Sequence, residues 1–122
     1  EMVPGADIRA TETSWQIYRG DNLSGRIIEA STTAGYNGEI RFLLATDQAG
    51  NVLGVRVTHH RETPGIGDGI DHRVSDWIYQ FEAQSLARSA WALHPAGDFD
   101  GLSGATITSR AMVSAVREAL SR

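Results

Sequence analysis

A glycine-rich segment in the middle of the chain separates two parts of the sequence with different patterns. Residues 62–69 read Glu-Thr-Pro-Gly-Ile-Gly-Asp-Gly, with one proline and three glycines. Proline has no backbone N–H to donate, and glycine loses more conformational freedom than other residues when it is ordered. This run is therefore predicted to be a loop rather than a helix or a central strand.

Short apolar runs precede this loop and indicate β-strands. They cover residues 15–18, 26–31, 39–46 and 51–60, and turn residues separate them at positions 19–22, 35–38 and 47–50. In the last run Leu53, Val55 and Val57 are expected to share one face, because side chains alternate along a strand. The pattern predicts an antiparallel sheet of hairpins with one buried face.

Helical spacing appears after the loop. Apolar residues between Val74 and Phe81 recur at intervals of three and four, which predicts a short amphipathic helix. A short strand is predicted at residues 90–93. The chain then ends in a longer helix, capped by Thr108 or Ser109 and carrying one apolar stripe: Met112, Val113, Val116, Ala119 and Leu120.

These elements together predict a single α+β domain, in which an antiparallel sheet of hairpins is packed by helices. The domain is expected over residues 13–122, after a loose N-terminal segment at residues 1–12. The chain begins with Glu1 rather than methionine, so we expect it to be a piece of a longer protein. Neither a signal peptide nor a run of 18 apolar residues is present, so no part of this sequence is predicted to span a membrane, and any membrane anchor would lie upstream of it.

Two residue types are missing, and their absence excludes several kinds of chemistry. The chain has no cysteine, and all 11 of its basic residues are arginine. Disulfides, thiolate nucleophiles, iron–sulfur clusters, Schiff bases and phosphate-loop lysines are therefore excluded. The formal net charge of −4 and the scattered arginines argue against nucleic acid as a partner.

The four histidines give no pattern that predicts a metal site. His59 and His60 are neighbours in a predicted strand and are expected to point to opposite faces, whereas a metal needs converging ligands. No metal ligands and no catalytic side chains are therefore predicted. His60 and Glu62, which flank the glycine-rich loop, remain weaker candidates for contact with a ligand or partner.

Small residues and hydroxyls gather just before the last predicted helix. Residues 103–109 read Ser-Gly-Ala-Thr-Ile-Thr-Ser, which places four hydroxyls within seven positions. The free N–H groups and the positive dipole end of a helix start favour an anion such as phosphate. The residues alone leave two interpretations open, an anion site and a well-capped helix.

The order Asp-Gly-Leu-Ser-Gly-Ala-Thr at residues 100–106 resembles the flavinylation motif of the FMN-binding domain family. That family includes the G subunit of bacterial Rnf electron-transport complexes and the related C subunit of the sodium-pumping NADH:quinone reductase. Residues 53–68 and 98–109 resemble two stretches of the G subunit, and Gly35-Tyr36-x-Gly38 matches as well. The likeness covers about residues 15–120.

The resemblance implies a covalent flavin. A separate transferase, with FAD as donor, would link FMN through its phosphate to Thr106, and without that transferase the protein would carry no flavin. Around Thr106 the resemblance implies a phosphate site with a recognition motif: Ser103, Gly104, Ala105 and Thr108, with Asp100. The flavin ring is expected under the glycine-rich loop, in contact with Thr63, Pro64, Gly65, Ile66 and Gly67.

The function that the resemblance implies is electron transfer within a membrane complex. The domain would pass electrons between other subunits instead of acting as an independent catalyst, and it would face the periplasm from an inner-membrane complex. Two alternatives remain open at this point. The chain is then either a flavin-free assembly and docking module of the same complex, or a protein that binds FMN without a covalent bond.

Overall fold

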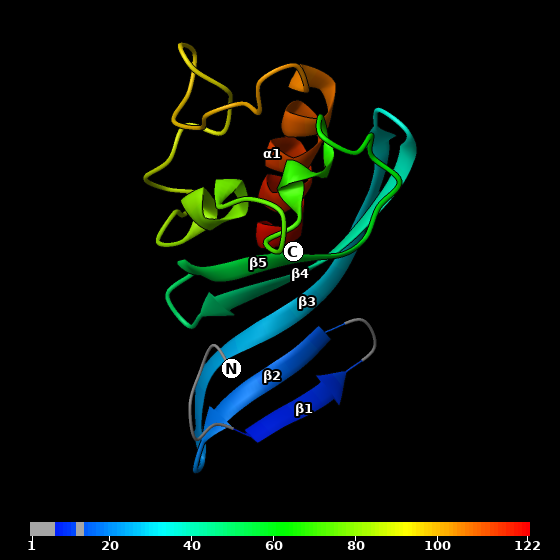
Figure 1. Ribbon diagram of the computed structural model, residues 1–122. Coiled ribbons are helices and arrows are strands. Elements are labelled where there is room, and N and C mark those ends of the chain that lie inside the picture. Colours follow the sequence, from blue (N-terminus) through cyan, green and yellow to red (C-terminus); the bar gives the residue numbers. More distant parts are fainter. Residues whose placement is uncertain (1–6, 12–13) are drawn as a thin grey trace.

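A five-stranded antiparallel sheet forms one layer of the protein (Figure 1). The computed structural model describes residues 7–11 and 14–122. Its strands pair in chain order: β1 (Asp7–Thr11), β2 (Ser14–Arg19), β3 (Asn22–Gly35), β4 (Gly38–Asp47) and β5 (Val52–His59). The predicted α+β class and the antiparallel sheet of hairpins are thus confirmed.

The N-terminal segment falls only partly within the described residues. Residues 7–11 of the segment that was expected to be loose form β1, which pairs antiparallel with β2. Residues 1–6 and 12 lie outside the described part of the chain. Each of the three later hairpins turns where the sequence predicted a turn. Strand β3 is longer than the predicted run at residues 26–31, because it extends from Asn22 to Gly35.

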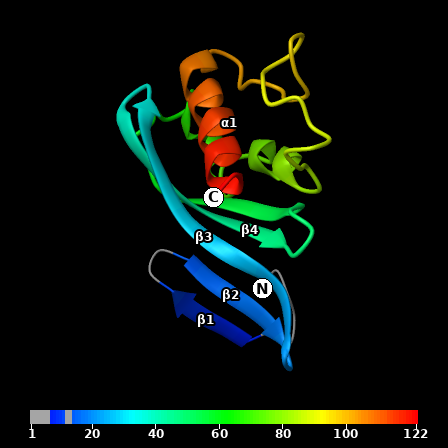
Figure 2. The ribbon, with the colours of Figure 1, turned by 180° about the vertical axis from the view of Figure 1, so that it is seen from behind.

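The C-terminal helix α1 (Thr106–Leu120) lies across one face of the sheet (Figures 1 and 2). Its predicted apolar stripe is buried against the side chains that β3, β4 and β5 turn toward it. An aromatic cluster from the segment between β5 and α1 completes the core, with Phe99 lying 5.0 Å from Phe81 and 4.9 Å from Trp91 between ring centroids. No helix of the described residues has the length and apolarity that crossing a bilayer requires.

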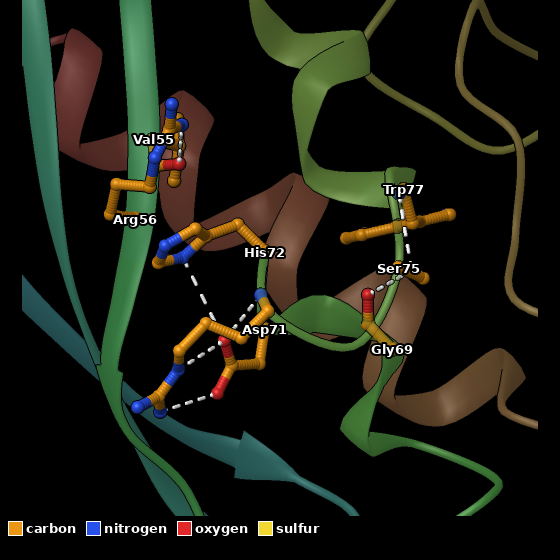
Figure 3. A network of polar contacts seen from close by, with 8 residues as sticks. Val55, Arg56, Gly69, Asp71, His72, Ser75 and Trp77 are labelled. Atoms are coloured by element: carbon orange, nitrogen blue, oxygen red, sulfur yellow. Dashed lines mark hydrogen bonds and ion pairs between the residues drawn. The ribbon is translucent and has the colours of Figure 1, made fainter.

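The amphipathic helix predicted from Val74 to Phe81 is wrong. The structure has a 3-10 helix of five residues there, η2 (Trp77–Phe81), and Val74 is exposed. Hydrogen bonds between a side chain and nearby backbone groups compete with the backbone hydrogen bonds that a longer helix would need. Ser75 Oγ donates to Gly69 O at 2.6 Å and accepts the Trp77 N–H at 3.2 Å (Figure 3).

The strand predicted at residues 90–93 is also wrong. This part of the described chain has a single bridge, between Leu93 and Phe99. The chain folds back on itself here, because the Asp98 carboxylate accepts the Ala90 N–H at 2.7 Å and Phe99 O accepts the His94 N–H at 2.8 Å. These hydrogen bonds pair residues 90–99 with one another, so this segment does not pair with another strand.

A bulge in β5 changes the predicted faces of that strand. Gly54 pairs with Ala45 and Val52 pairs with Thr46, so Leu53 is an extra residue between two register positions. Val52 therefore turns into the core with Val55, and Leu53 is only half-buried. A strict alternation of side chains could not anticipate this one-residue shift.

Candidate functional site

Three segments that are distant in the sequence surround a cavity of about 390 Å³. One is the turn between β3 and β4, the second is the glycine-rich loop after β5, and the third is the start of α1. This volume falls within the range of small-molecule sites, roughly 300–1,000 Å³. The cavity is lined by Tyr36, Thr63, Ile66, Gly67, Gly104, Ala105, Thr106, Ile107 and Thr108.

The start of α1 is not capped in the way that the sequence predicted. The helix begins at Thr106, its N-cap residue is Ala105, and no described side chain makes a capping hydrogen bond there. The predicted caps, Thr108 and Ser109, lie inside the first turn. Since the first N–H groups of a helix have no partner within the helix, this end of α1 is suited to an anion in the cavity.

Four hydroxyls lie in this region, and their environments differ. Ser109 Oγ is fully buried, accepts the Leu102 N–H at 2.8 Å and donates to Ala105 O at 2.8 Å. Thr108 is buried and donates its hydroxyl to Glu62. Ser103 is exposed outside the cavity lining. Of these four hydroxyls, all in the described part of the chain, Thr106 alone is both exposed and part of the cavity wall.

A buried carboxylate joins two walls of the cavity. Glu62 is 4% exposed, and its two oxygens accept the backbone N–H groups of Tyr36 and Asn37, each at 3.0 Å. The same carboxylate accepts the hydroxyl of Thr108 from α1. Glu62 therefore connects the β3–β4 turn to the first turn of the helix.

Two glycines allow the loops to approach closely. A Cβ at Gly67 would lie 3.0 Å from both Glu62 Cβ and Thr108 Oγ1, so a side chain there would push against the aliphatic part of Glu62 and against the Thr108 hydroxyl. Gly104 has a φ of 75°, a conformation that L side chains rarely adopt. Both positions therefore favour glycine in the walls of the cavity.

The structure brings most of the predicted flavin-contact residues together. Those that line the cavity are Thr63, Ile66, Gly67, Gly104, Ala105, Thr106 and Thr108. Four others lie outside the lining: Pro64, Gly65, Asp100 and Ser103.

Asp100 has a different set of contacts. Its backbone oxygen accepts the Trp77 Nε1–H at 2.7 Å and the Gln80 side-chain amide at 3.1 Å. The exposed Asp100 carboxylate lies 3.4 Å from His94 Nε2. These contacts hold the loop before α1 against η2 instead of contributing to the cavity.

Two lining residues were missed in the sequence, Tyr36 and Ile107. They are 67% and 53% exposed, and Ile66 beside them is 49% exposed. Large apolar side chains exposed together around one cavity are typical of a binding surface. The signal for Tyr36 was its place in the matching Gly35-Tyr36-x-Gly38 stretch, and Ile107 followed Thr106 directly in the hydroxyl-rich segment.

A second polar cluster lies next to the glycine-rich loop, outside the cavity lining (Figure 3). Arg73 donates to the buried Asp71 carboxylate from Nε at 3.1 Å and from Nη2 at 2.7 Å, and this lowers the pKa of Asp71 to about 2. His72 Nδ1 lies 3.7 Å from the same carboxylate. Among the described residues no group of three or more histidine or acidic side chains could hold a metal ion.

Comparison with known proteins identifies relatives for most of the chain. The FMN-binding domain family matches residues 35–121. The G subunit of the ion-translocating oxidoreductase complex is 46% identical over 105 residues in Salmonella typhimurium, which covers 83% of this chain and 51% of that protein. In Escherichia coli K12 the corresponding protein is 47% identical over 103 residues, which covers 81% of this chain and 50% of that protein. The chain thus spans about half the length of these relatives.

A solved structure has the same fold. It is the C subunit of the Na⁺-translocating NADH-quinone reductase from Parabacteroides distasonis, with a TM-score of 0.67 and 22% sequence identity. The match covers 88% of this chain and 58% of that chain. At this identity the likeness supports the arrangement of sheet and helix and carries no functional detail.

Proposed function

The chain belongs to the FMN-binding domain family, and we propose that it carries FMN covalently, in phosphoester linkage to Thr106, as an electron-transfer domain of a membrane-bound oxidoreductase complex. The observation that carries this proposal is the cavity at the start of α1. One of its walls combines an uncapped helix N-terminus with an exposed threonine, Thr106. The other walls contribute Gly67 and the exposed apolar side chains of Tyr36 and Ile66.

The helix start suits the phosphate of FMN. A phosphodiester carries one negative charge, and the N–H groups and dipole of the first helical turn favour such a charge. Gly104 and Ala105 carry little or no side chain and leave the backbone accessible from the cavity. The proposed phosphate site therefore comprises Gly104, Ala105, Thr106 and Thr108, with Ser103 and Asp100 belonging to the motif that the transferase recognises.

The apolar rim suits the flat ring of the flavin. Ile66, Ile107 and Tyr36 present exposed apolar surface around the cavity, and aromatic side chains pack well against flat ring systems. Thr63 and Gly67 complete the loop side, next to Pro64 and Gly65. When bound, FMN supplies the reversible electron transfer that no side chain of this chain supplies at neutral pH.

Attachment to Thr106 is proposed as a transfer from FAD by a separate transferase. Thr106 Oγ forms a bond to the phosphorus on the FMN side of the pyrophosphate, the bond to the AMP phosphate breaks, and AMP leaves. The hydroxyl proton is released to the medium. Such an attack requires a hydroxyl that the transferase can reach, and Thr106 is exposed.

The partners and the location of this domain are proposals as well. The named relatives are G subunits of an ion-translocating oxidoreductase complex. We propose that this domain receives electrons from one subunit of such a complex and passes them to another, and that it faces the periplasm at the inner membrane. In this role it is a redox subunit and has no soluble substrate of its own.

Co-expression with an FAD-dependent flavin transferase tests the covalent bond. After denaturation, flavin fluorescence is expected to migrate with the wild-type polypeptide and to be absent from Thr106→Val. Thr58→Val is the matched control, because Thr58 is an exposed strand residue outside the cavity lining. Flavin that binds the native wild type but is lost on denaturation would favour noncovalent binding, and a wild type that never holds flavin would favour an assembly module.

A further inference from the structure

We propose that Glu62 is the residue that restricts flavin attachment to Thr106, because it holds the competing hydroxyl of Thr108 in a buried hydrogen bond and fixes that hydroxyl between two walls of the cavity. This inference rests on the proposed function. It adds a specificity-determining role for a residue outside the attachment motif.

Thr108 is the competitor that the geometry identifies. Both Thr106 and Thr108 line the cavity, whereas Ser103 does not and Ser109 is fully buried between Leu102 and Ala105. Two threonine hydroxyls two residues apart on the same helix start therefore stand beside the proposed phosphate site. If flavin is attached to only one of these two hydroxyls, a feature of the structure must distinguish them.

The contact between Thr108 and Glu62 makes that distinction. Thr108 Oγ1 donates to Glu62 Oε1, while Thr106 is exposed to the solvent. A hydroxyl that donates its proton to a buried carboxylate must break that bond before it can attack phosphorus. Breaking a hydrogen bond to a buried charged group leaves both partners poorly solvated, which is costly.

Charge strengthens the distinction. Both Glu62 oxygens accept hydrogen bonds, from Tyr36 N and Thr108 Oγ1 on one oxygen and from Asn37 N on the other, as an ionised carboxylate does. A phosphodiester on Thr108 would place a second negative charge at the position that now contacts this carboxylate. Like charges at such short range repel, so the product on Thr108 is disfavoured as well as the reaction.

The walls around Glu62 leave the Thr108 hydroxyl little freedom to turn away. Gly67 packs so closely on Glu62 and Thr108 that a Cβ would lie 3.0 Å from each. The backbone N–H groups of Tyr36 and Asn37 also hold the carboxylate in place. The hydroxyl of Thr108 is thus enclosed by three segments, and Thr106 is left as the accessible acceptor.

The test measures where the flavin is attached. Wild type, Glu62→Ala, Glu62→Gln and the exposed-carboxylate control Glu29→Gln are each co-expressed with the transferase, and the flavin is located by peptide mass spectrometry. In Glu62→Ala the ratio of flavin on Thr106 to flavin on Thr108 is expected to fall at least about tenfold, as the loss of a hydrogen bond to a charged group implies. A variant Thr106→Val/Glu62→Ala is expected to regain flavin, on Thr108, that Thr106→Val alone lacks.

Glu62→Gln separates selectivity from stability. The glutamine Oε1 still accepts the Thr108 hydroxyl, but its Nε2 cannot accept the Asn37 N–H. We expect this variant to unfold more easily than wild type and yet to carry flavin on Thr106 alone. A role limited to stability also predicts Thr106 alone in Glu62→Gln, but it predicts that the attachment site stays the same in Glu62→Ala as well, and there the two roles differ.

Exclusive attachment to Thr106 in folded Glu62→Ala would overturn the inference and leave the proposed function intact. An unlabelled wild type would instead contradict the proposed function. If Glu62→Ala does not fold, NMR of flavin-free wild type provides the second measurement. A slowly exchanging Thr108 hydroxyl proton is expected there, and a freely exchanging one would overturn the inference.

Discussion

Ser109 is a fully buried hydroxyl that joins the loop before α1 to the first turn of that helix. It accepts the Leu102 N–H and donates to Ala105 O. In Ser109→Ala the Leu102 N–H loses its partner, and we expect the free energy of unfolding in urea to fall by about 1–3 kcal/mol. Ser114→Ala, at an exposed position of α1, is the matched control. Equal stability of the two variants would contradict this role of Ser109.

The contact between the Asp71 carboxylate and Arg73 is sensitive to acid. The Arg73 guanidinium lowers the pKa of Asp71 from 3.8 to about 2 in the folded state. Because the pKa of Asp71 is lower in the folded state, its ionised carboxylate stabilises the fold at pH values above its unfolded-state pKa. This contribution is lost as the pH falls from about 4 toward 2. We expect the free energy of unfolding of Asp71→Asn to vary less over that range than that of wild type, measured by urea titration. A parallel pH profile for the two would contradict the contact, and Asp21→Asn, in the exposed β2–β3 turn, is the control.

The residues around Thr106 show what a sequence can and cannot predict about a site. The small residues and hydroxyls of 103–109 are contiguous, so a helix start in this segment could be predicted directly, although Thr108 and Ser109 lie inside the first turn instead of capping it. Tyr36 lies far away in the sequence and reaches the cavity because Glu62 holds its turn against α1. A long-range contact through a buried carboxylate leaves no local pattern.

The stability of the protein depends on the buried apolar stripe of α1, which the spacing of apolar residues predicted. Met112 is fully buried between the helix and the sheet. Met112→Ala leaves a cavity that the packed core cannot refill, and we expect a loss of roughly 2–5 kcal/mol in urea unfolding. Arg117→Ala, on the exposed side of α1, is expected to change stability by less than about 0.5 kcal/mol. Similar losses for both variants would contradict this packing.

The other elements could be predicted where apolar residues keep the regular spacing of a strand or a helix. They could not be predicted where local contacts interrupt that spacing. The middle parts of β3 and β4 follow strand alternation, with Ile28 and Ala30 buried in β3 and Ile40, Phe42 and Leu44 buried in β4, and α1 follows helical spacing. Between Val74 and Phe81 the spacing is helical, but Ser75 binds the backbone on both sides and shortens the helix to η2. The bulge at Leu53 likewise depends on pairing with β4, which the strand itself does not encode.

At the level of the whole molecule, the order of the strands from β2 to β5 follows from the hairpins, because the turns between these strands place neighbours side by side. The position of the cavity follows from that order. The β3–β4 turn and the glycine-rich loop after β5 emerge near the same end of α1, where the helix begins (Figure 1). The sheet and helix thus bring three segments to one site, and the proposed flavin would be the group that all three contact.

Peptide mapping of the protein co-expressed with the transferase tests the central claim most directly. Because the chain has no lysine, trypsin releases residues 89–110 as one peptide that contains all four hydroxyls of the helix start. Tandem mass spectrometry of this peptide is expected to place one FMN, attached with loss of water, on Thr106. FMN on Ser103, Thr108 or Ser109 instead, or an unmodified peptide despite an active transferase, would contradict the account.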